Sequence, residues 1–224
     1  MSLTLSSHAA KPLAAAALAV AGAVALTACG GSGGGGGDKI SDAPTTSATS
    51  APATTASAAP TPSGAPAINL PADVKVEITD PGPGKDAATT KAIADLEYAI
   101  KALLDGTAQG DGSAASMRYA YTGQAGAYWA QRIAAVKQSG QTITGTYRYY
   151  RIDAQASGQG IQAHYCEDQS KAFGKDVKTG KVNRNAPSVK SYLYYTVGMF
   201  KDTAGTWQVS QVNWTKGAHQ CLNG

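Results

Sequence analysis

The sequence predicts an α+β domain over residues 68–224, in which helices come first and a four-stranded antiparallel sheet follows. Apolar residues between positions 86 and 139 recur at three- and four-residue spacing, which is typical of amphipathic helices. Beyond residue 140, β-branched and aromatic residues dominate, and the Thr-Ala-Gly segment 203–205 is short enough to be a hairpin loop. Helices followed by a run of strands are the pattern of an α+β fold.

The first half of this domain is expected to be helical. A helix over 86–105 can be capped by Thr89 or Thr90 and ended by Gly106. One face of it carries a continuous apolar stripe, formed by Ile93, Leu96, Ile100, Leu103 and Leu104. Two further helical segments are expected at 113–121 and 122–139.

The second half has the composition of strands. Four segments are predicted to form the sheet: 142–154, 160–168, 190–202 and 206–216. Before the first helix, apolar and charged residues alternate over 74–78, which is compatible with a short extra strand.

The order of elements resembles the nuclear-transport-factor-like superfamily. The resemblance covers residues 86–216 and includes the final hairpin, where Gly-Thr-Trp-Gln-Val begins the last strand with Trp207 and Val209. Such a fold implies a conical roll, in which helices close one side of a strongly curved sheet. Enzymes of that superfamily use carboxylates or Tyr/Asp pairs inside the cone, so the resemblance also implies an internal pocket.

The first 28 residues have the zones of a lipoprotein signal peptide. A polar start ending in Lys11 precedes an uncharged stretch over 12–25. The run Leu26-Thr27-Ala28-Cys29 resembles a lipobox, in which Cys29 would receive a diacylglycerol, with palmitate as a typical chain. A short transmembrane helix and an ordinary cleaved signal are the alternatives. Residues 29–67 are rich in Gly, Ser, Thr, Pro and Ala, and are expected to form a disordered tether.

More narrowly, the chain resembles a group of actinobacterial lipoproteins that have no assigned activity. The resemblance rests on the signal peptide and tether and on three segments of the domain, 165–171, 175–182 and 217–221. It implies an architecture and no catalytic residue. The location follows from the lipid instead, since an acylated Cys29 would hold the protein at the outer face of the cytoplasmic membrane, within the cell-wall zone.

A disulfide is expected between Cys166 and Cys221. If Cys29 carries a lipid, these are the two remaining thiols, and an even pair outside the cytoplasm is typical of a disulfide. A reactive thiol or a redox pair is the alternative, although the sequence contains no Cys-x-x-Cys motif.

Aromatic residues on the strands suggest a pocket. Asp153 is the best internal carboxylate, and the alternative is a surface salt bridge with Arg151. Some of the tyrosines are expected to fill the core instead. The candidate pocket comprises Tyr147, Tyr149, Asp153, Tyr192, Tyr194 and Trp207.

No catalytic, cofactor or metal motif stands out. His164 and His219 each lie two residues before a cysteine, but metal sites need three or more convergent ligands. Neither a nucleophile elbow nor a phosphate-binding loop is present, so no cofactor is expected.

A basic surface is expected after the second strand. It comprises Lys171, Lys175, Lys178, Lys181, Arg184 and Lys190. Such a surface can meet anionic cell-wall polymers or phospholipid headgroups, or can be a solvated loop. Nucleic acid is excluded as a partner if the protein is exported.

These observations favour a membrane-anchored extracytoplasmic protein that acts without catalysis, as a ligand-binding or envelope-interaction module. Its partners would be the membrane, through the lipid, and a small apolar ligand, a wall polymer or an envelope protein. The alternatives are a small hydrolase or isomerase that uses Asp153 or His164 in the cone, and an accessory subunit of an envelope complex.

Overall fold

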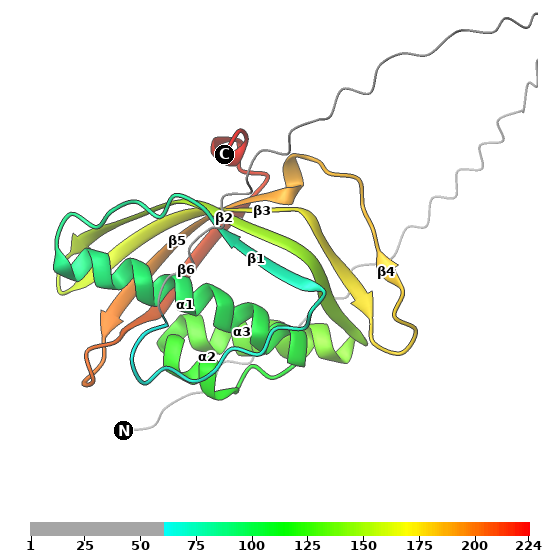
Figure 1. Ribbon diagram of the computed structural model, residues 1–224, viewed down its shortest axis with the longest axis horizontal. Helices are drawn as coiled ribbons and strands as arrows, with labels where there is room; N and C mark the ends of the chain where they lie inside the picture. Colours follow the sequence, from blue (N-terminus) through cyan, green and yellow to red (C-terminus); the bar gives the residue numbers. More distant parts are fainter. Residues whose placement is uncertain (1–60) are drawn as a thin grey trace, which may run out of the picture. The chain divides into compact units, whose positions relative to one another are not determined.

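The computed structural model describes residues 61–224 (Figure 1). The predicted signal peptide, Cys29 and the predicted tether up to residue 60 lie outside the described residues. Residues 61–67, expected to belong to the tether, run beside the first helix, where the Tyr98 hydroxyl donates to the Pro66 carbonyl over 2.8 Å. Within residues 61–224, no helix is both long enough and apolar enough to span a bilayer.

The sheet has six strands. They are β1 (Val74–Ile78), β2 (Gln141–Ser157), β3 (Gly160–Asp176), β4 (Val182–Asn183), β5 (Tyr192–Lys201) and β6 (Trp207–Lys216). The order across the sheet is β1-β2-β3-β5-β6, and the two-residue β4 pairs with β3. β1 runs parallel to β2, and the other pairs are antiparallel.

The mixed α+β class is as predicted, but two details of the prediction are wrong. The sheet has six strands instead of four, because β1 adds an edge on β2 and β4 adds a short one on β3. The helices also do not begin the domain, since β1 precedes them in the chain. The alternation of Val74, Val76 and Ile78 with charged residues is the sequence signal for β1.

Three helices cover one face of the sheet, here called the inner face (Figure 1). They are α1 (Ala87–Gln109), α2 (Ala115–Ala120) and α3 (Gly123–Gln138). The opposite face, here called the outer face, carries the C-terminal 3₁₀ helix η2 (His219–Cys221). β2 and β3, the two longest strands, arch over the helices.

The ends of α1 differ from the prediction. Asp86 caps it, because its carboxylate accepts the backbone N–H of Thr89 over 2.8 Å, while the Thr89 hydroxyl accepts the N–H of Asp86. The helix runs through Gly106 and ends at Gly110, which has a left-handed φ of 65°. A side chain at Gly106 would meet Met117 at 2.9 Å, so this glycine lets α2 pack closely against α1.

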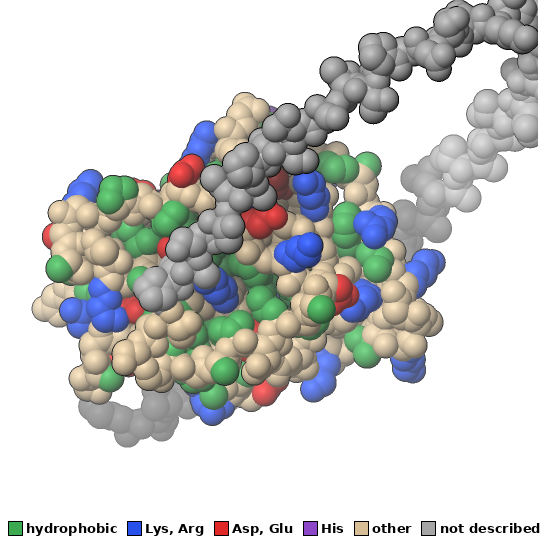
Figure 2. Space-filling model, in the orientation of Figure 1, with side chains coloured by type: hydrophobic (Ala, Val, Ile, Leu, Met, Phe, Trp, Pro, Cys, Tyr) green, Lys and Arg blue, Asp and Glu red, His purple; other side chains and the backbone are tan. Residues whose placement is uncertain are grey.

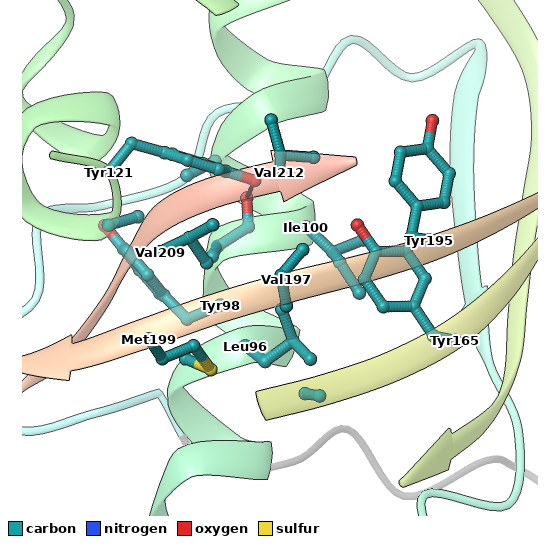
Figure 3. Close-up of a cluster of buried hydrophobic side chains, with 14 of the residues drawn as sticks. Leu96, Tyr98, Ile100, Tyr121, Tyr165, Tyr195, Val197, Met199, Val209 and Val212 are labelled. Carbon is teal, nitrogen blue, oxygen red and sulfur yellow. Dashed lines mark hydrogen bonds between the residues drawn. The ribbon is translucent and has the colours of Figure 1, made fainter. Parts of the chain in front are cut away.

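The main core lies between α1 and the inner face. Leu96 and Ile100 of α1 are almost completely buried, together with Val197 and Met199 of β5 and Val209 of β6 (Figure 3). Each fully buried aliphatic side chain contributes about 1.5–3 kcal/mol to folding. α1 is also tied to β6 by Asp95, whose carboxylate accepts the backbone N–H of Trp207 over 2.7 Å and pairs with Lys91.

A second, smaller core lies on the outer face around the disulfide. Cys166 of β3 is bonded to Cys221 of η2, with 5.5 Å between their Cα atoms. Tyr150 and Ala218 are buried against this bond. The predicted pairing is therefore present, and it holds the C-terminal segment onto the sheet.

Replacing both Cys166 and Cys221 with Ser is expected to lower the free energy of unfolding by about 4 kcal/mol, because the bond closes a loop of 55 residues. Urea unfolding of the wild type and of the double variant measures this difference. The same loss should follow reduction of the wild type, whereas reduction of the double variant should change nothing. Equal stability of the wild type and the variant would contradict the assigned role of the bond.

Candidate functional site

A cavity of about 150 Å³ enters the protein between two helices and the sheet. α1 and α3 form one wall, and the inner face of β2, β3 and β5 forms the other. Most of the lining is apolar or aromatic: Ile100, Leu103, Leu104, Trp129, Ile133, Val136, Ile143, Tyr147, Tyr149, Tyr165 and Tyr195. Four polar side chains complete it: Thr107, Arg132, Glu167 and Gln169.

Glu167 is the buried acid of this cavity. Its side chain projects from β3, and the residue is only 3% exposed. The Tyr149 hydroxyl donates a hydrogen bond to the Glu167 carboxyl over 2.9 Å, from the residue directly opposite on β2. The side chains of Tyr195 and Gln169 also lie near this carboxyl and favour its charged form. Backbone pairing thus brings hydrogen-bonding groups from three strands around one carboxyl.

Burial governs the protonation of this group. Loss of water around Glu167 raises the pKa of its carboxyl above the ordinary value, even though the hydrogen bonds from Gln169, Tyr195 and Tyr149 act in the opposite direction. Burial also raises the pKa of Tyr149, Tyr165 and Tyr195 well above 10. These tyrosine hydroxyls therefore stay protonated at neutral pH and can donate hydrogen bonds.

The tyrosines form a packed aromatic wall. The rings of Tyr165 and Tyr195, which are paired across β3 and β5, are stacked with 4.7 Å between centroids (Figure 3). The Tyr149 ring lies 6.1 Å from that of Tyr165 in a tilted arrangement. Because stacked and tilted contacts fix ring positions, the hydroxyl groups around Glu167 are held by the same packing.

The cavity runs from the surface to the interior. Arg132 of α3 is exposed, and Thr107, Trp129 and Gln169 are half-buried, whereas Glu167 is buried. The site therefore has a positive charge at its outer end and a titratable acid at its inner end. This arrangement can hold a small molecule and can exchange a proton with it at Glu167.

The structure separates the six predicted pocket residues. Tyr147 and Tyr149 line the cavity. Tyr192 and Tyr194 lie on the outer face, packed near the disulfide. Trp207 is buried in β6 but does not line the cavity, and its indole Nε1 has no hydrogen-bond partner within residues 61–224.

Asp153 does not lie in the cavity, because a bulge reverses the alternation of β2. The pairing of β2 with β3 shifts between Tyr150 and Asp153, and Arg151 there has a φ of 53°. Before the bulge Tyr147 and Tyr149 point inward, whereas after it Ile152 does. Asp153 is therefore exposed on the outer face, beside His164.

Glu167 was not predicted as the internal acid, although strand alternation could have found it. Ile161, Ala163 and Tyr165 of β3 are buried in the main core, and Glu167 is the next residue in that alternating series. The regular alternation of β3 therefore predicts that Glu167 faces inward. The bulge in β2 makes the same kind of prediction wrong for Asp153.

The two histidines lie outside the cavity. His164 stacks on Tyr194 of the outer face, with 5.7 Å between ring centroids, and hydrogen-bonds the Thr196 hydroxyl over 3.0 Å. His219 is exposed on η2. Over residues 61–224, no group of three or more His, Cys, Asp or Glu side chains is placed to hold a metal ion.

The predicted basic residues extend from the second half of β3 to the segment before β5, on the side where Figure 2 shows several Lys and Arg side chains. Lys171 and Lys175 lie within β3, because this strand runs to Asp176 instead of ending at 168 as predicted. Lys175 pairs with Asp73, and the Arg184 guanidinium lies 5.0 Å from the centroid of the Phe173 ring. The other members are exposed: Lys171, Lys178, Lys181 and Lys190. Val177, in the same region, is 63% exposed.

Replacing Glu167 with Gln is expected to stabilise the protein more as pH rises. Because the pKa of the buried carboxyl is raised, folding is penalised only where the unfolded chain has lost the proton, above about pH 4.5. Each tenfold difference in the proton affinity of this carboxyl between the folded and unfolded states changes the free energy of unfolding by about 1.4 kcal/mol. Thermal unfolding should thus give similar midpoints for wild type and variant at pH 4, and a higher midpoint for the variant at pH 8. The exposed Asp153→Asn is the control, and an equal gain there would contradict the assignment.

Comparisons with known proteins give structural similarity alone. No protein-family profile matches the chain, and no curated protein matches it. The intermembrane space region of the chloroplast protein ARC6 is similar at 13% identity, with 54% of this chain and 94% of that chain covered and a TM-score of 0.33. A ketosteroid isomerase, described as putative, from Shewanella frigidimarina NCIMB 400 is similar at 16% identity, with 62% and 98% covered and a TM-score of 0.31. Similarity at this level assigns the chain to no family and to no activity.

Proposed function

We propose that this protein binds a small molecule in the tyrosine-lined cavity and does so at the cell envelope, anchored to the outer face of the cytoplasmic membrane through Cys29. The observation that carries the binding proposal is a cavity with one buried carboxyl, Glu167, at its inner end. A largely apolar pocket with a few convergent polar groups is typical of a small-molecule site.

The size of the cavity limits the ligand. A volume of about 150 Å³ matches that of cavities that take up benzene, so a ligand of about six to eight non-hydrogen atoms fits. The apolar wall of Leu103, Ile133 and Val136 suits a hydrocarbon body, and Glu167 with its tyrosines suits one polar group.

Proton transfer to a bound substrate is the second candidate function. The observation that favours it is the raised pKa of Glu167 beside the Tyr149 hydroxyl, since catalytic acids and bases have pKa values shifted in this way. This reaction would be an isomerisation by Glu167, in place of the Asp153 or His164 that the sequence suggested. The two functions differ in the fate of the ligand, which leaves a binding protein unchanged.

The basic surface is a proposed envelope contact. Its exposed lysines carry positive charge that can meet anionic wall polymers or phospholipid headgroups. None of these residues lines the cavity, so this contact and ligand binding can occur together.

Benzyl alcohol is expected to bind in the cavity with a dissociation constant on the order of 1 mM, or about 0.5 kcal/mol per non-hydrogen atom. Protein NMR of the full chain in detergent measures the binding. Leu103→Trp should abolish it, because Leu103 lines the cavity and the larger side chain would fill it. Val177→Trp adds the same ring at an exposed position outside the cavity and should leave binding intact.

Failure of benzyl alcohol and toluene alike to bind the wild type would contradict the proposal that this cavity is a ligand site. Recovery of a chemically altered ligand after incubation would favour the second candidate function over simple binding.

Cys29→Ala is expected to abolish incorporation of an alkyne-tagged palmitate when the protein is produced in a bacterium that processes lipoproteins. The reason is that the sulfur of Cys29 is the proposed attachment atom. The double variant with Ser at positions 166 and 221 retains Cys29 and should keep the label. Undiminished labelling of Cys29→Ala would contradict the proposed anchor.

A further inference from the structure

The buried carboxyl of Glu167 has no cationic partner among the described residues. The ion pairs that the structure shows between residues 61 and 224 join Lys91 to Asp95 and Lys175 to Asp73. A buried carboxylate without a counter-ion is costly, because the charge has lost its hydration and gains no opposite charge in exchange. A protein that needed only a filled core would be more stable with an apolar side chain at this position. The position of Glu167 therefore leaves room for a cationic partner, which no described residue supplies.

The charged and titratable groups around Glu167 are few. β2, β3 and β5 contribute Tyr147, Tyr149, Tyr165 and Tyr195, and Tyr121 follows α2. α3 contributes Arg132, which lies at the exposed end of the cavity and is not among the groups that affect the pKa of Glu167. α1 presents only Ile100, Leu103, Leu104 and Thr107, none of which is charged. The neighbouring Asp168 also raises the pKa of Glu167, because it is negative as well.

The walls around Glu167 suit a positive charge. Aromatic rings attract cations placed over their faces, and this attraction grows when water is excluded. Five aromatic residues line the cavity: Trp129, Tyr147, Tyr149, Tyr165 and Tyr195. An ammonium group also donates hydrogen bonds, which the Glu167 carboxylate can accept once it has lost its proton.

We propose that the natural ligand of the cavity is a small organic cation, with one ammonium group at Glu167 and an apolar body between α1 and α3. This inference rests on the proposed binding function and adds the chemical class of the ligand. Arg132 at the outer end disfavours a second positive charge, so the far end of the ligand is neutral or negative. Because the carboxyl must be ionised to pair with the cation, binding at a pH where Glu167 is protonated releases a proton.

Three probes of nearly equal size test this inference: benzylammonium, benzyl alcohol and benzoate. They share a benzyl or phenyl body and differ in charge. We expect benzylammonium to bind the full-length protein in detergent at least tenfold more tightly than benzyl alcohol at pH 8. The advantage should shrink toward pH 5, where Glu167 retains its proton for a larger share of the molecules. Isothermal titration calorimetry in two buffers of different ionisation enthalpy measures both the affinity and the proton released.

Two matched variants test whether the tighter binding of benzylammonium depends on Glu167. Glu167→Gln keeps the shape of the side chain and removes the charge, so it should lose the tenfold advantage while still binding benzyl alcohol. Asp153→Asn removes one negative charge from the outer face and should keep the advantage, because Asp153 lies outside the cavity.

The possible outcomes separate this inference from the proposed function. If benzylammonium binds no more tightly than benzyl alcohol, the inference that the ligand is a cation is wrong, and the cavity remains a proposed ligand site. Preference for benzoate overturns this inference as well and assigns recognition to Arg132. An advantage that survives in Glu167→Gln also overturns it. If none of the probes binds, both the inference and the proposed function fail.

Discussion

The packing of α1 against the inner face of the sheet is the interaction on which the rest of the structure depends. Leu96 and Ile100 bury their side chains against β5 and β6, and Asp95 fixes the helix to the start of β6 by a hydrogen bond. Toward the C-terminal half of α1, the helix and α3 stand over β2 and β3 without filling the space between them. The cavity occupies that space, so the same helix that completes the core also forms one wall of the site.

Much of the fold follows from patterns in the sequence, and its exceptions have local causes. Periodic apolar residues locate α1 and α3, and β-branched and aromatic residues locate the long strands. The two short strands are harder to predict: β4 has only two residues, and its pairing depends on where the end of β3 lies. α1 continues through Gly106 and is capped by Gly110, because Gly106 serves the close packing of Met117 instead of ending the helix, which is a tertiary effect.

The site was only partly predictable, because one residue changes which side chains of β2 face inward. Arg151 takes a left-handed backbone conformation, which glycine adopts far more often than arginine does. The sequence therefore gives no sign of the bulge. Its consequence is that Tyr147 and Tyr149 reach the cavity while Asp153 does not. β3 pairs with β5 without a register shift from Ile161 to Glu167, and its alternation places Glu167 inside. Alternation along the regular strand β3 thus predicts the polar residue of the pocket, whereas alternation along the bulged strand β2 does not.

A carbon-13 NMR titration of the Glu167 side-chain carboxyl tests the central claim most directly, because it observes the one group that distinguishes this cavity from a filled core. We predict a titration midpoint above 4.5, since burial disfavours the charged form. A midpoint at or below that value would mean that the carboxyl is hydrated or already paired with a cation. Such a result would contradict the assignment of Glu167 as a buried acid that has no cationic partner until a ligand binds.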